Sequence, residues 1–270
     1  MIALVREENV SAIVGPPCSV GARVCAILAK RFDLAQISWA ATDPRLSNQR
    51  RFPTLTRVIG SAMRIGRALK EVMSYFEWRR YAMLYTDDKG ARKCRSIAEG
   101  LRRVSANSEI ISKYNVVIDK TEITHDDIDG FLDRLEENAR IVLVCLDTDL
   151  NTRRFMLRLH DRNFDRPEYV WIIPDFIRDR AKNPEPWNHP DGPGADGKDE
   201  EAKQAFQFAL MANLAKMRLS RCENGSLYSP FLHDAVYVYA LALNKTLARG
   251  GRPNRGRLLT RAATGVQFMG

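Results

Sequence analysis

The amino-acid sequence predicts an α/β fold in which parallel β-strands are covered by helices on both faces. Short apolar, β-branched runs alternate with stretches of helical periodicity along most of the chain, which is the pattern of repeated β–α units. The strand runs are apolar at consecutive positions, as is typical of strands that are buried on both faces. The length of 270 residues allows one large domain or two smaller lobes.

The elements are expected to follow one another in regular order. Each strand is predicted from a short apolar or β-branched run, and each helix from apolar residues that recur at helical spacing. Ser61 is predicted as an N-cap, because a serine hydroxyl can accept a bond from a free helical N–H, and Gly250–Gly251 is predicted to end the last helix. In chain order we expect the strand Ala12–Val14, the helix Ser19–Phe32, the strand Gln36–Trp39, a helix from Ser61 to Phe76, the strand Tyr81–Tyr85, the helix Ala91–Val104, the strand Tyr114–Ile118, the helix Asp126–Asn138, the strand Ile141–Leu146, the helix Thr152–Arg162, the strand Tyr169–Ile173 and the helix Phe231–Arg249.

Three segments depart from this alternation. Seven of the sixteen residues in Asn183–Lys198 are Pro or Gly, which predicts a surface loop. Ala205–Met217 is compatible with either a strand or a helix. Lys245–Arg261 carries six basic residues and no acidic one, and we interpret it as the solvated end of a helix followed by a basic loop.

Charge and motifs exclude several classes of function. The chain carries 42 Lys and Arg against 33 Asp and Glu, a net charge of +9, but no nucleic-acid-binding motif accompanies this charge, so we predict no nucleic-acid partner. A P-loop, a GxGxxG loop directly after a strand, an HExxH motif and a GxSxG elbow are all missing, and the four histidines share no metal-ligand spacing. We therefore predict no catalytic residue, no metal and no cofactor in this chain.

Neither a membrane span nor a signal peptide is predicted. The longest apolar run, Ala235–Leu243, has nine residues, whereas a spanning helix needs about 20. Met1–Val5 is too short for the apolar core of a signal peptide. Taken alone, these observations indicate a soluble cytosolic protein.

The five cysteines include no CxxC pair, which argues against a zinc or dithiol redox motif. Cys145 lies in an apolar run and is predicted to be a small buried hydrophobic residue. Cys18 and Cys25 are seven positions apart on one predicted helix, and a rise of about 1.5 Å per residue separates them too far for a disulfide.

Segments spread over nearly the whole chain resemble one family. They are IVGPPCS (Ile13–Ser19), QISWAATDP (Gln36–Pro44) with RFPTLTR (Arg51–Arg57), Tyr81–Tyr85 with CRSIAEGL (Cys94–Leu101), Pro186–Trp187 with QAFQ (Gln204–Gln207), and FLHDAVYVYALAL (Phe231–Leu243). In order and spacing they resemble the extracellular ligand-binding region of receptor guanylate cyclases, the group that includes natriuretic peptide receptors. QISWAATDP is also similar to metabotropic glutamate receptors, whose ligand-binding domains share the fold.

The resemblance implies a type I periplasmic-binding-protein clamshell of two α/β lobes. Met1–Trp78 would belong to the first lobe, Arg79–Tyr228 to the second, and Ser229–Gly270 would return to the first. In the family two further strands precede the match to Ala12–Val14, and Gly265–Gly270 matches the start of a returning strand. We therefore expect an incomplete first lobe, truncated at both ends, and expect the chain expressed alone to aggregate or unfold early.

Several site residues follow from the resemblance to natriuretic peptide receptors. Tyr85 and Glu99 match a tyrosine and a glutamate of the hormone-contact surface; the alternatives are a strand end in the core for Tyr85 and a solvated helix residue for Glu99. Two phenylalanines of that surface are replaced by Arg95 and Ser96, which argues against a natriuretic-type hormone. The family's chloride-binding turn matches Pro17–Cys18, where proline has no N–H to donate, so an anion site is disfavoured.

Two cysteines match family cysteines whose partners this sequence lacks. Cys18 would pair with a cysteine upstream of the matched region. Cys94 matches a cysteine that bridges to a loop near Asn163–Phe164, where this sequence has no cysteine.

The metabotropic resemblance implies a different set of ligand contacts. Ser19, Ser38 and Thr42 are the nearest equivalents of the small polar residues that bind an amino-acid ligand. Helix capping for Ser19 and turn formation for Thr42–Asp43 are the alternatives. Asn224 and Asn244 each begin an Asn-x-Ser/Thr acceptor for N-glycosylation.

We therefore hypothesise that the chain is the ligand-binding region of a single-pass receptor guanylate cyclase, on the extracellular face of the plasma membrane. It would respond to a peptide ligand, act within a homodimer and have no enzymatic activity of its own. The alternative is an amino-acid receptor of the metabotropic glutamate class that binds its ligand between the lobes. A soluble α/β enzyme is a third possibility.

Overall fold

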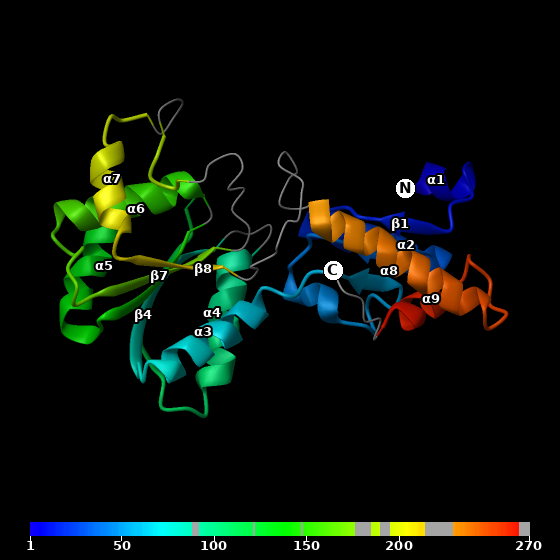
Figure 1. Cartoon of the computed structure of the whole chain (residues 1–270), viewed down its shortest axis with the longest axis horizontal. Helices are drawn as coiled ribbons and strands as arrows, with labels where there is room; N and C mark the ends of the chain where they lie inside the picture. Colours follow the sequence, from blue (N-terminus) through cyan, green and yellow to red (C-terminus); the bar gives the residue numbers. More distant parts are fainter. Residues whose placement is uncertain are drawn as a thin grey trace. The chain divides into compact units, whose positions relative to one another are not determined.

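The computed structural model describes residues 1–87, 92–120, 122–146, 148–175, 185–189, 195–213 and 229–264. The chain divides into two compact units (Figure 1), of which the first comprises Met1–Ser61 with Leu219–Gly270 and the second Ala62–Arg218. Each unit contains its own parallel β-sheet with helices on both faces. The predicted α/β fold of parallel sheets flanked by helices is therefore confirmed.

The first unit is built on a three-stranded parallel sheet of order β1-β2-β3. One face packs against helix α2 through Ala22 and Ala26, and the other carries α8 and α9, whose Val238 and Leu259 pack with Ala35 of β2. Its elements are α1 (Ile2–Arg6), β1 (Ala12–Val14), α2 (Ser19–Phe32), β2 (Ala35–Ser38), the 3₁₀ helix η1 (Pro44–Ser47), β3 (Leu55–Arg57), α8 (Ser229–Leu247) and α9 (Gly256–Ala263).

The second unit is built on a five-stranded parallel sheet of order β5-β4-β6-β7-β8. Helices α5, α6 and α7 cover one face and α3 and α4 the other (Figure 1). Its elements are α3 (Met63–Tyr75), β4 (Arg80–Thr86), α4 (Lys93–Ser105), β5 (Ile111–Ile118), α5 (His125–Asn138), β6 (Ile141–Cys145), α6 (Asp149–Asp161), β7 (Val170–Asp175), α7 (Asp199–Phe206) and β8 (Ala209–Asn213).

The central strands of the second sheet explain the continuous apolar runs in the sequence. Along β6, Val142 and Val144 pack among α5, α6 and α7, whereas Ile141, Leu143 and Cys145 pack with α3 and α4. All five residues are buried. Because successive side chains of a strand point to opposite faces, a strand covered on both sides needs apolar residues at every position.

Helices α3 and α4 approach each other closely at two glycines. A Cβ on Gly66 would lie 2.2 Å from the backbone nitrogen of Leu101, and one on Gly100 would lie 2.5 Å from the carbonyl oxygen of Met63. No side chain fits in that space, so these glycines allow the two backbones to touch. The contact fixes α4 against α3 within the second unit.

The predicted lobe boundary at Trp78 differs from the division into compact units. The second unit begins at Ala62, because Ile65, Leu69 and Met73 of α3 pack on Tyr81 and Met83 of its sheet, and the boundary between the lobes stays a prediction. The predicted second boundary, at residue 228, falls outside the described residues.

Two local predictions also differ from the structure. Helix α3 begins at Met63 with Ala62 as its N-cap, so Ser61 is not the cap. The predicted basic loop contains helix α9, whose Leu259, Ala262 and Ala263 are buried, because these apolar residues recur at helical spacing among the arginines. The ambiguous stretch from Ala205 includes the end of α7 and strand β8.

Candidate functional site

Ligand sites in parallel α/β sheets lie at the carboxyl ends of the strands. In the second unit this edge is marked by Tyr85, the last residue but one of β4, by Asp87 directly after the strand, and by the start of α4. Arg95 of α4 links Asp87 to Glu99: its Nη1 lies 2.6 Å from Asp87 Oδ2 and its Nε 3.0 Å from Glu99 Oε1. The predicted residue Glu99 thus forms one charged group with Arg95 and Asp87. The charges of this group also act on the other predicted residue, Tyr85.

Burial and neighbouring charges shift the pKa values of Tyr85 and Arg95. Burial raises the pKa of the Tyr85 hydroxyl above its ordinary value, and the positive charge of Arg95 partly offsets the effect. The hydrogen bond with Asp87, followed by that with Glu99, raises the pKa of Arg95. Oδ1 of Asp87 is buried and has no hydrogen-bond partner among the described residues. The site therefore combines a neutral phenol, a permanent cation and two carboxylates.

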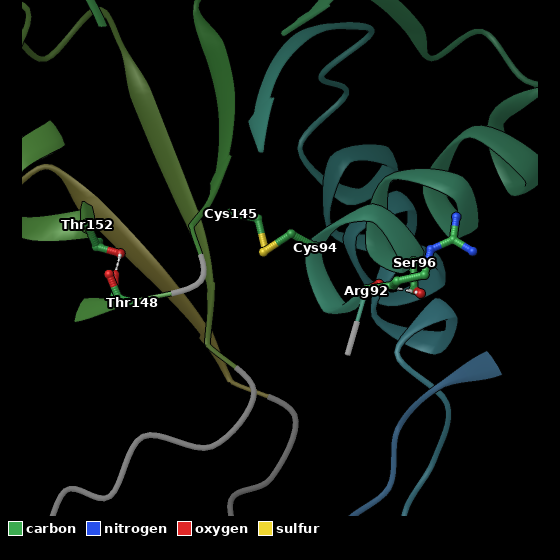
Figure 2. Close-up of a disulfide and its surroundings, with 6 residues drawn as sticks. All are labelled: Arg92, Cys94, Ser96, Cys145, Thr148 and Thr152. Atoms are coloured by element: carbon green, nitrogen blue, oxygen red, sulfur yellow. Dashed lines mark hydrogen bonds between the residues drawn. A yellow bond between two sulfur atoms is a disulfide. The ribbon is translucent and has the colours of Figure 1, made fainter. Parts of the chain in front are cut away.

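A disulfide lies beside this group and corrects two cysteine predictions. Cys94, in the first turn of α4, is bonded to Cys145, the last residue of β6, with their Cα atoms 5.4 Å apart (Figure 2). Cys145 is therefore buried but is not a free hydrophobic residue, and Cys94 does have a partner in this chain. The pairing arises because β6 is the neighbour of β4 in the sheet, so the end of β6 lies beside the helix that follows β4.

Hydrogen bonds fix the helix starts on either side of the disulfide. Ser96, one of the predicted substitutions for an apolar anchor, is buried, and its Oγ donates to the carbonyl oxygen of Arg92 at 2.6 Å (Figure 2). Thr148 caps α6 by accepting from Asn151 N at 3.1 Å, and Thr152 Oγ1 donates to the Thr148 carbonyl at 3.0 Å. Ser96 thus lies on the buried face of α4, whereas the side chains of Arg95 and Glu99 are partly exposed.

The carboxyl edge of the first sheet holds the other predicted ligand residues. Ser38 Oγ donates to the Pro16 carbonyl at 3.3 Å, and Ser19 Oγ accepts from Asp43 N at 3.2 Å. The exposed fractions are 0% for Ser38 and 7% for Ser19. Thr42 is half-buried beside Asp43. The structure brings Ser19 next to the Thr42–Asp43 turn, but both serine hydroxyls bond to the backbone of neighbouring loops.

Asp43 is a structural centre of this edge, although it was predicted only as part of a turn. Its carboxylate is 2% exposed and accepts bonds from Arg45 N at 2.8 Å and from Arg45 Nη2 at 2.6 Å. Burial alone would raise the pKa of Asp43, but the hydrogen bonds from Arg45 outweigh it and hold the pKa below its ordinary value. Arg57 donates to the Asp43 carbonyl at 3.0 Å. A signal in the sequence is the acid followed by Pro and Arg, Asp43-Pro44-Arg45.

The turn before α2 carries the disfavoured anion site. Pro17 and Cys18 are exposed, and Cys18 Sγ accepts from Gly21 N at 3.3 Å, so the sulfur itself caps the helix. Cys18 and Cys25 are both free thiols, which confirms that they do not pair with each other. Pro17 carries no N–H and the Gly21 N–H is already bonded, so neither offers a donor to an anion here.

Of the two predicted glycosylation sites, only Asn244 lies among the described residues. Asn224 lies outside the described residues. Asn244 is exposed on α8, but the acceptor residue Thr246 is buried and its Oγ1 donates to the Ala242 carbonyl at 2.7 Å.

A pocket of about 260 Å³ lies elsewhere on the second unit, beside α6, and contains none of the predicted residues. One of its lining residues, Arg153, has a side chain that is 3% exposed and binds Asp196, Asp199 and the Trp187 carbonyl, which ties the loop before α7 to α6. The pocket is lined by His125, Leu150, Arg153, Arg154, Leu157, Arg158, Asp161, Asp196 and Lys198.

Among the described residues, no three His, Cys, Asp or Glu side chains converge as metal ligands. In the same part of the chain, no helix has the length and apolarity needed to cross a bilayer.

Comparison with known proteins identifies the family. The family model "Receptor family ligand binding region" matches residues 1–270. The chain is 28% identical over 317 aligned positions to receptor-type guanylate cyclase gcy-13 of Caenorhabditis elegans. This alignment covers 99% of the chain and 29% of that protein. The chain is 26% identical to atrial natriuretic peptide receptor 3 of Rattus norvegicus, covering 92% of this chain and 49% of the receptor, and 23% identical to the human receptor of the same name.

The chain thus spans half or less of the length of these relatives. The family model, in contrast, extends over all 270 residues. This chain therefore belongs to the family of receptor ligand-binding regions.

Proposed function

We propose that this chain is the extracellular ligand-binding region of a membrane-anchored receptor guanylate cyclase and that its ligand is a peptide. The observation that carries the proposal is the family match over the whole chain, together with relatives named as receptor-type guanylate cyclases and as natriuretic peptide receptors. The cyclase activity would belong to the rest of the receptor, and this segment would bind ligand without catalysing a reaction.

The Cys94–Cys145 disulfide supports the extracellular location. Disulfides form and persist in oxidising compartments such as the secretory pathway and the cell surface, and are rare in the reducing cytosol. This bond is buried in the second unit and joins two of its core elements, so it is part of the fold. The soluble cytosolic reading suggested by the missing signal and span is therefore disfavoured.

The chemistry of the two sheet edges favours a peptide over an amino-acid ligand. The serine hydroxyls expected to bind an amino acid are buried and bonded to Pro16 and Asp43. On the second unit, Arg95 and Glu99 are 42% and 40% exposed and stand beside Tyr85, which offers charged and aromatic contacts to a polar peptide. We propose Tyr85, Arg95 and Glu99 as ligand contacts.

Association with a second copy is part of the same proposal. Val20, Val24 and Ile27 form an exposed apolar stripe along α2, with exposed fractions between 44% and 53%. Burying such a stripe against an identical helix would remove apolar surface from water. Sedimentation equilibrium of the secreted chain should show a dimer that Val24→Glu weakens. A strictly monomeric species at high protein concentration would contradict the dimer.

Calorimetry tests the ligand class directly. The chain, secreted from eukaryotic cells, is titrated with peptide fractions from the source tissue and, separately, with free amino acids. A peptide should bind, and Arg95→Ala should weaken it by about tenfold or more, because charged contacts in an interface contribute on the order of 1–3 kcal/mol. The matched control is Arg79→Ala: Arg79 also pairs with a carboxylate, that of Glu109 at 3.2 Å, but precedes β4 at the opposite edge of the sheet.

Binding of an amino acid that Ser38→Ala abolishes and Arg95→Ala leaves unchanged would favour the metabotropic alternative and overturn the peptide proposal.

A further inference from the structure

The loop between α1 and β1 contains a third Asn-x-Ser/Thr segment, Asn9-Val10-Ser11. Such a segment is an acceptor for N-linked glycosylation in secreted proteins. We propose that Asn9 carries an N-linked oligosaccharide. The proposal rests on the extracellular location proposed above, since the transfer takes place in the secretory pathway.

The structure gives Asn9 the surroundings that an attached oligosaccharide needs. The residue is exposed and lies outside helix and strand. Its φ of +50° is in the left-handed region, which asparagine adopts more readily than most residues, so the loop turns at this position. Val10 is half-buried, and its N–H donates to the Leu4 carbonyl at 3.4 Å. The loop is therefore held to α1 by its neighbour while Asn9 remains accessible.

The position is compatible with ligand binding. Asn9 precedes β1 and so lies at the amino edge of the first sheet, whereas the Gly15–Ser19 turn and Ser38 lie at its carboxyl edge. An oligosaccharide on Asn9 extends from the edge opposite the candidate ligand residues of this unit. It would also shield Ile2 and Leu4 of α1, which are exposed apolar side chains.

The same criteria separate Asn9 from Asn244. Asn244 and Thr246 are two positions apart on α8, which places them about 200° apart around the helix axis. The Thr246 hydroxyl is buried and bonded to Ala242. The folded chain therefore cannot present both groups of that acceptor together. Asn9 and Ser11 lie in irregular chain, where both can be presented.

The transfer needs one co-substrate, a lipid-linked donor of the oligosaccharide. Nδ2 of Asn9 forms a bond to the anomeric carbon of an oligosaccharide carried on a polyprenyl pyrophosphate. The bond from that carbon to the pyrophosphate oxygen breaks, and the polyprenyl pyrophosphate leaves with the electron pair while Nδ2 loses one proton. No oxidant or reductant takes part.

Peptide mass spectrometry tests the proposal. The full chain, secreted from eukaryotic cells behind a cleavable signal, is treated with a glycan-releasing amidase in heavy-oxygen water, which converts each glycosylated asparagine to labelled aspartate. We expect the label at Asn9 in the wild-type chain and its loss in Asn9→Gln and in Ser11→Ala. Ser11→Thr is the matched control, since it keeps the acceptor hydroxyl and should retain the modification. Ser11→Ala leaves the left-handed Asn9 in place, so loss of the label in this variant does not depend on a change in the turn.

Unlabelled Asn9 on secreted protein would overturn the proposal. The location is tested separately by protease treatment of intact cells that express the full-length receptor. Cleavage of this region from outside, combined with unlabelled Asn9, would overturn the glycosylation site alone. Protection from the protease would overturn the extracellular location on which it rests.

Discussion

At the scale of single residues, the carboxyl edge of the first sheet depends on one buried charge. Asp43 is held by Arg45 and lies among backbone groups that Ser19 and Arg57 also bind. A buried carboxylate is stable only when hydrogen bonds and an opposite charge replace its water. Asp43 therefore stabilises the loop that follows β2.

Asp43→Asn should lower the free energy of unfolding by about 1–2 kcal/mol, because the amide loses the charged hydrogen bonds to the half-exposed Arg45. Chemical denaturation at neutral pH measures the loss. Arg79→Ala, which breaks an exposed pair, serves as the control and should change stability by less than about 0.5 kcal/mol. An Asp43→Asn chain as stable as the wild type would contradict the structural role.

The same residue gives a pH dependence. The folded pKa of Asp43 lies below the ordinary value of 3.8, so its contribution is complete above that value and is lost as the pH falls through the lower folded pKa. Thermal unfolding followed from neutral pH into acid should show the wild type losing more stability than Asp43→Asn. Parallel curves for the two proteins would show that Asp43 contributes nothing to the acid sensitivity.

At the scale of elements, the position of α4 decides the geometry of the proposed ligand contacts. The helix is held at its first turn by the disulfide to β6 and further along by the glycine contact with α3. Both constraints act on the segment that carries Arg95 and Glu99.

Replacing Cys94 and Cys145 by alanine should lower the free energy of unfolding by about 2–4 kcal/mol, as expected for a bond that closes a loop of about 50 residues. Denaturation of the double variant measures it. The reduced wild type is the control and should show a similar loss; a variant as stable as the oxidised protein would contradict a structural disulfide.

Gly100→Ala should lower the free energy of unfolding by about 1–3 kcal/mol, since the new methyl group meets the backbone of Met63 and forces the helices apart. Gly130→Ala is the matched control. A Cβ on Gly130, in α5, meets nothing within 4 Å, so this change should stabilise the protein by about 0.5–1 kcal/mol. Equal effects of the two changes on thermal unfolding would argue against the close contact.

Local patterns predicted most elements, and long-range contacts account for what they missed. The run Ile141–Leu146 identified β6 because burial on both faces leaves a signal at every position. The Cys94–Cys145 pair leaves no such signal in the sequence. The pair depends on β6 lying next to β4, and the order of strands in a sheet cannot be deduced from the spacing of residues along the chain. Helix α9 was missed because its basic residues outweighed the helical spacing of Leu259, Ala262 and Ala263.

In the candidate site, too, single residues could be predicted from the sequence, whereas their contacts could not. Tyr85 and Glu99 were predicted from family resemblance, but the bonds of Arg95 that join Glu99 to Asp87, two residues after Tyr85, required the structure. Ser19 and Ser38 illustrate the opposite outcome: small polar residues at a strand end resemble ligand contacts in sequence, whereas here they bond to loops of the fold.

At the scale of the whole molecule, the two units each present polar residues at the carboxyl edge of a parallel sheet. The proposed peptide contacts Tyr85, Arg95 and Glu99 belong to the second unit, and the proposed Asn9 oligosaccharide belongs to the amino edge of the first. In the proposed receptor, ligand binding at such an edge would have to change the activity of the proposed cyclase segment.

The most direct measurement is cyclic GMP production by cells that express the full-length product of this gene, exposed to peptide fractions from outside. A peptide should raise cyclic GMP, with the dose–response curve shifted to higher concentration by Arg95→Ala and left in place by Arg79→Ala. A product without cyclase activity, or one that responds only to amino acids, would contradict the account.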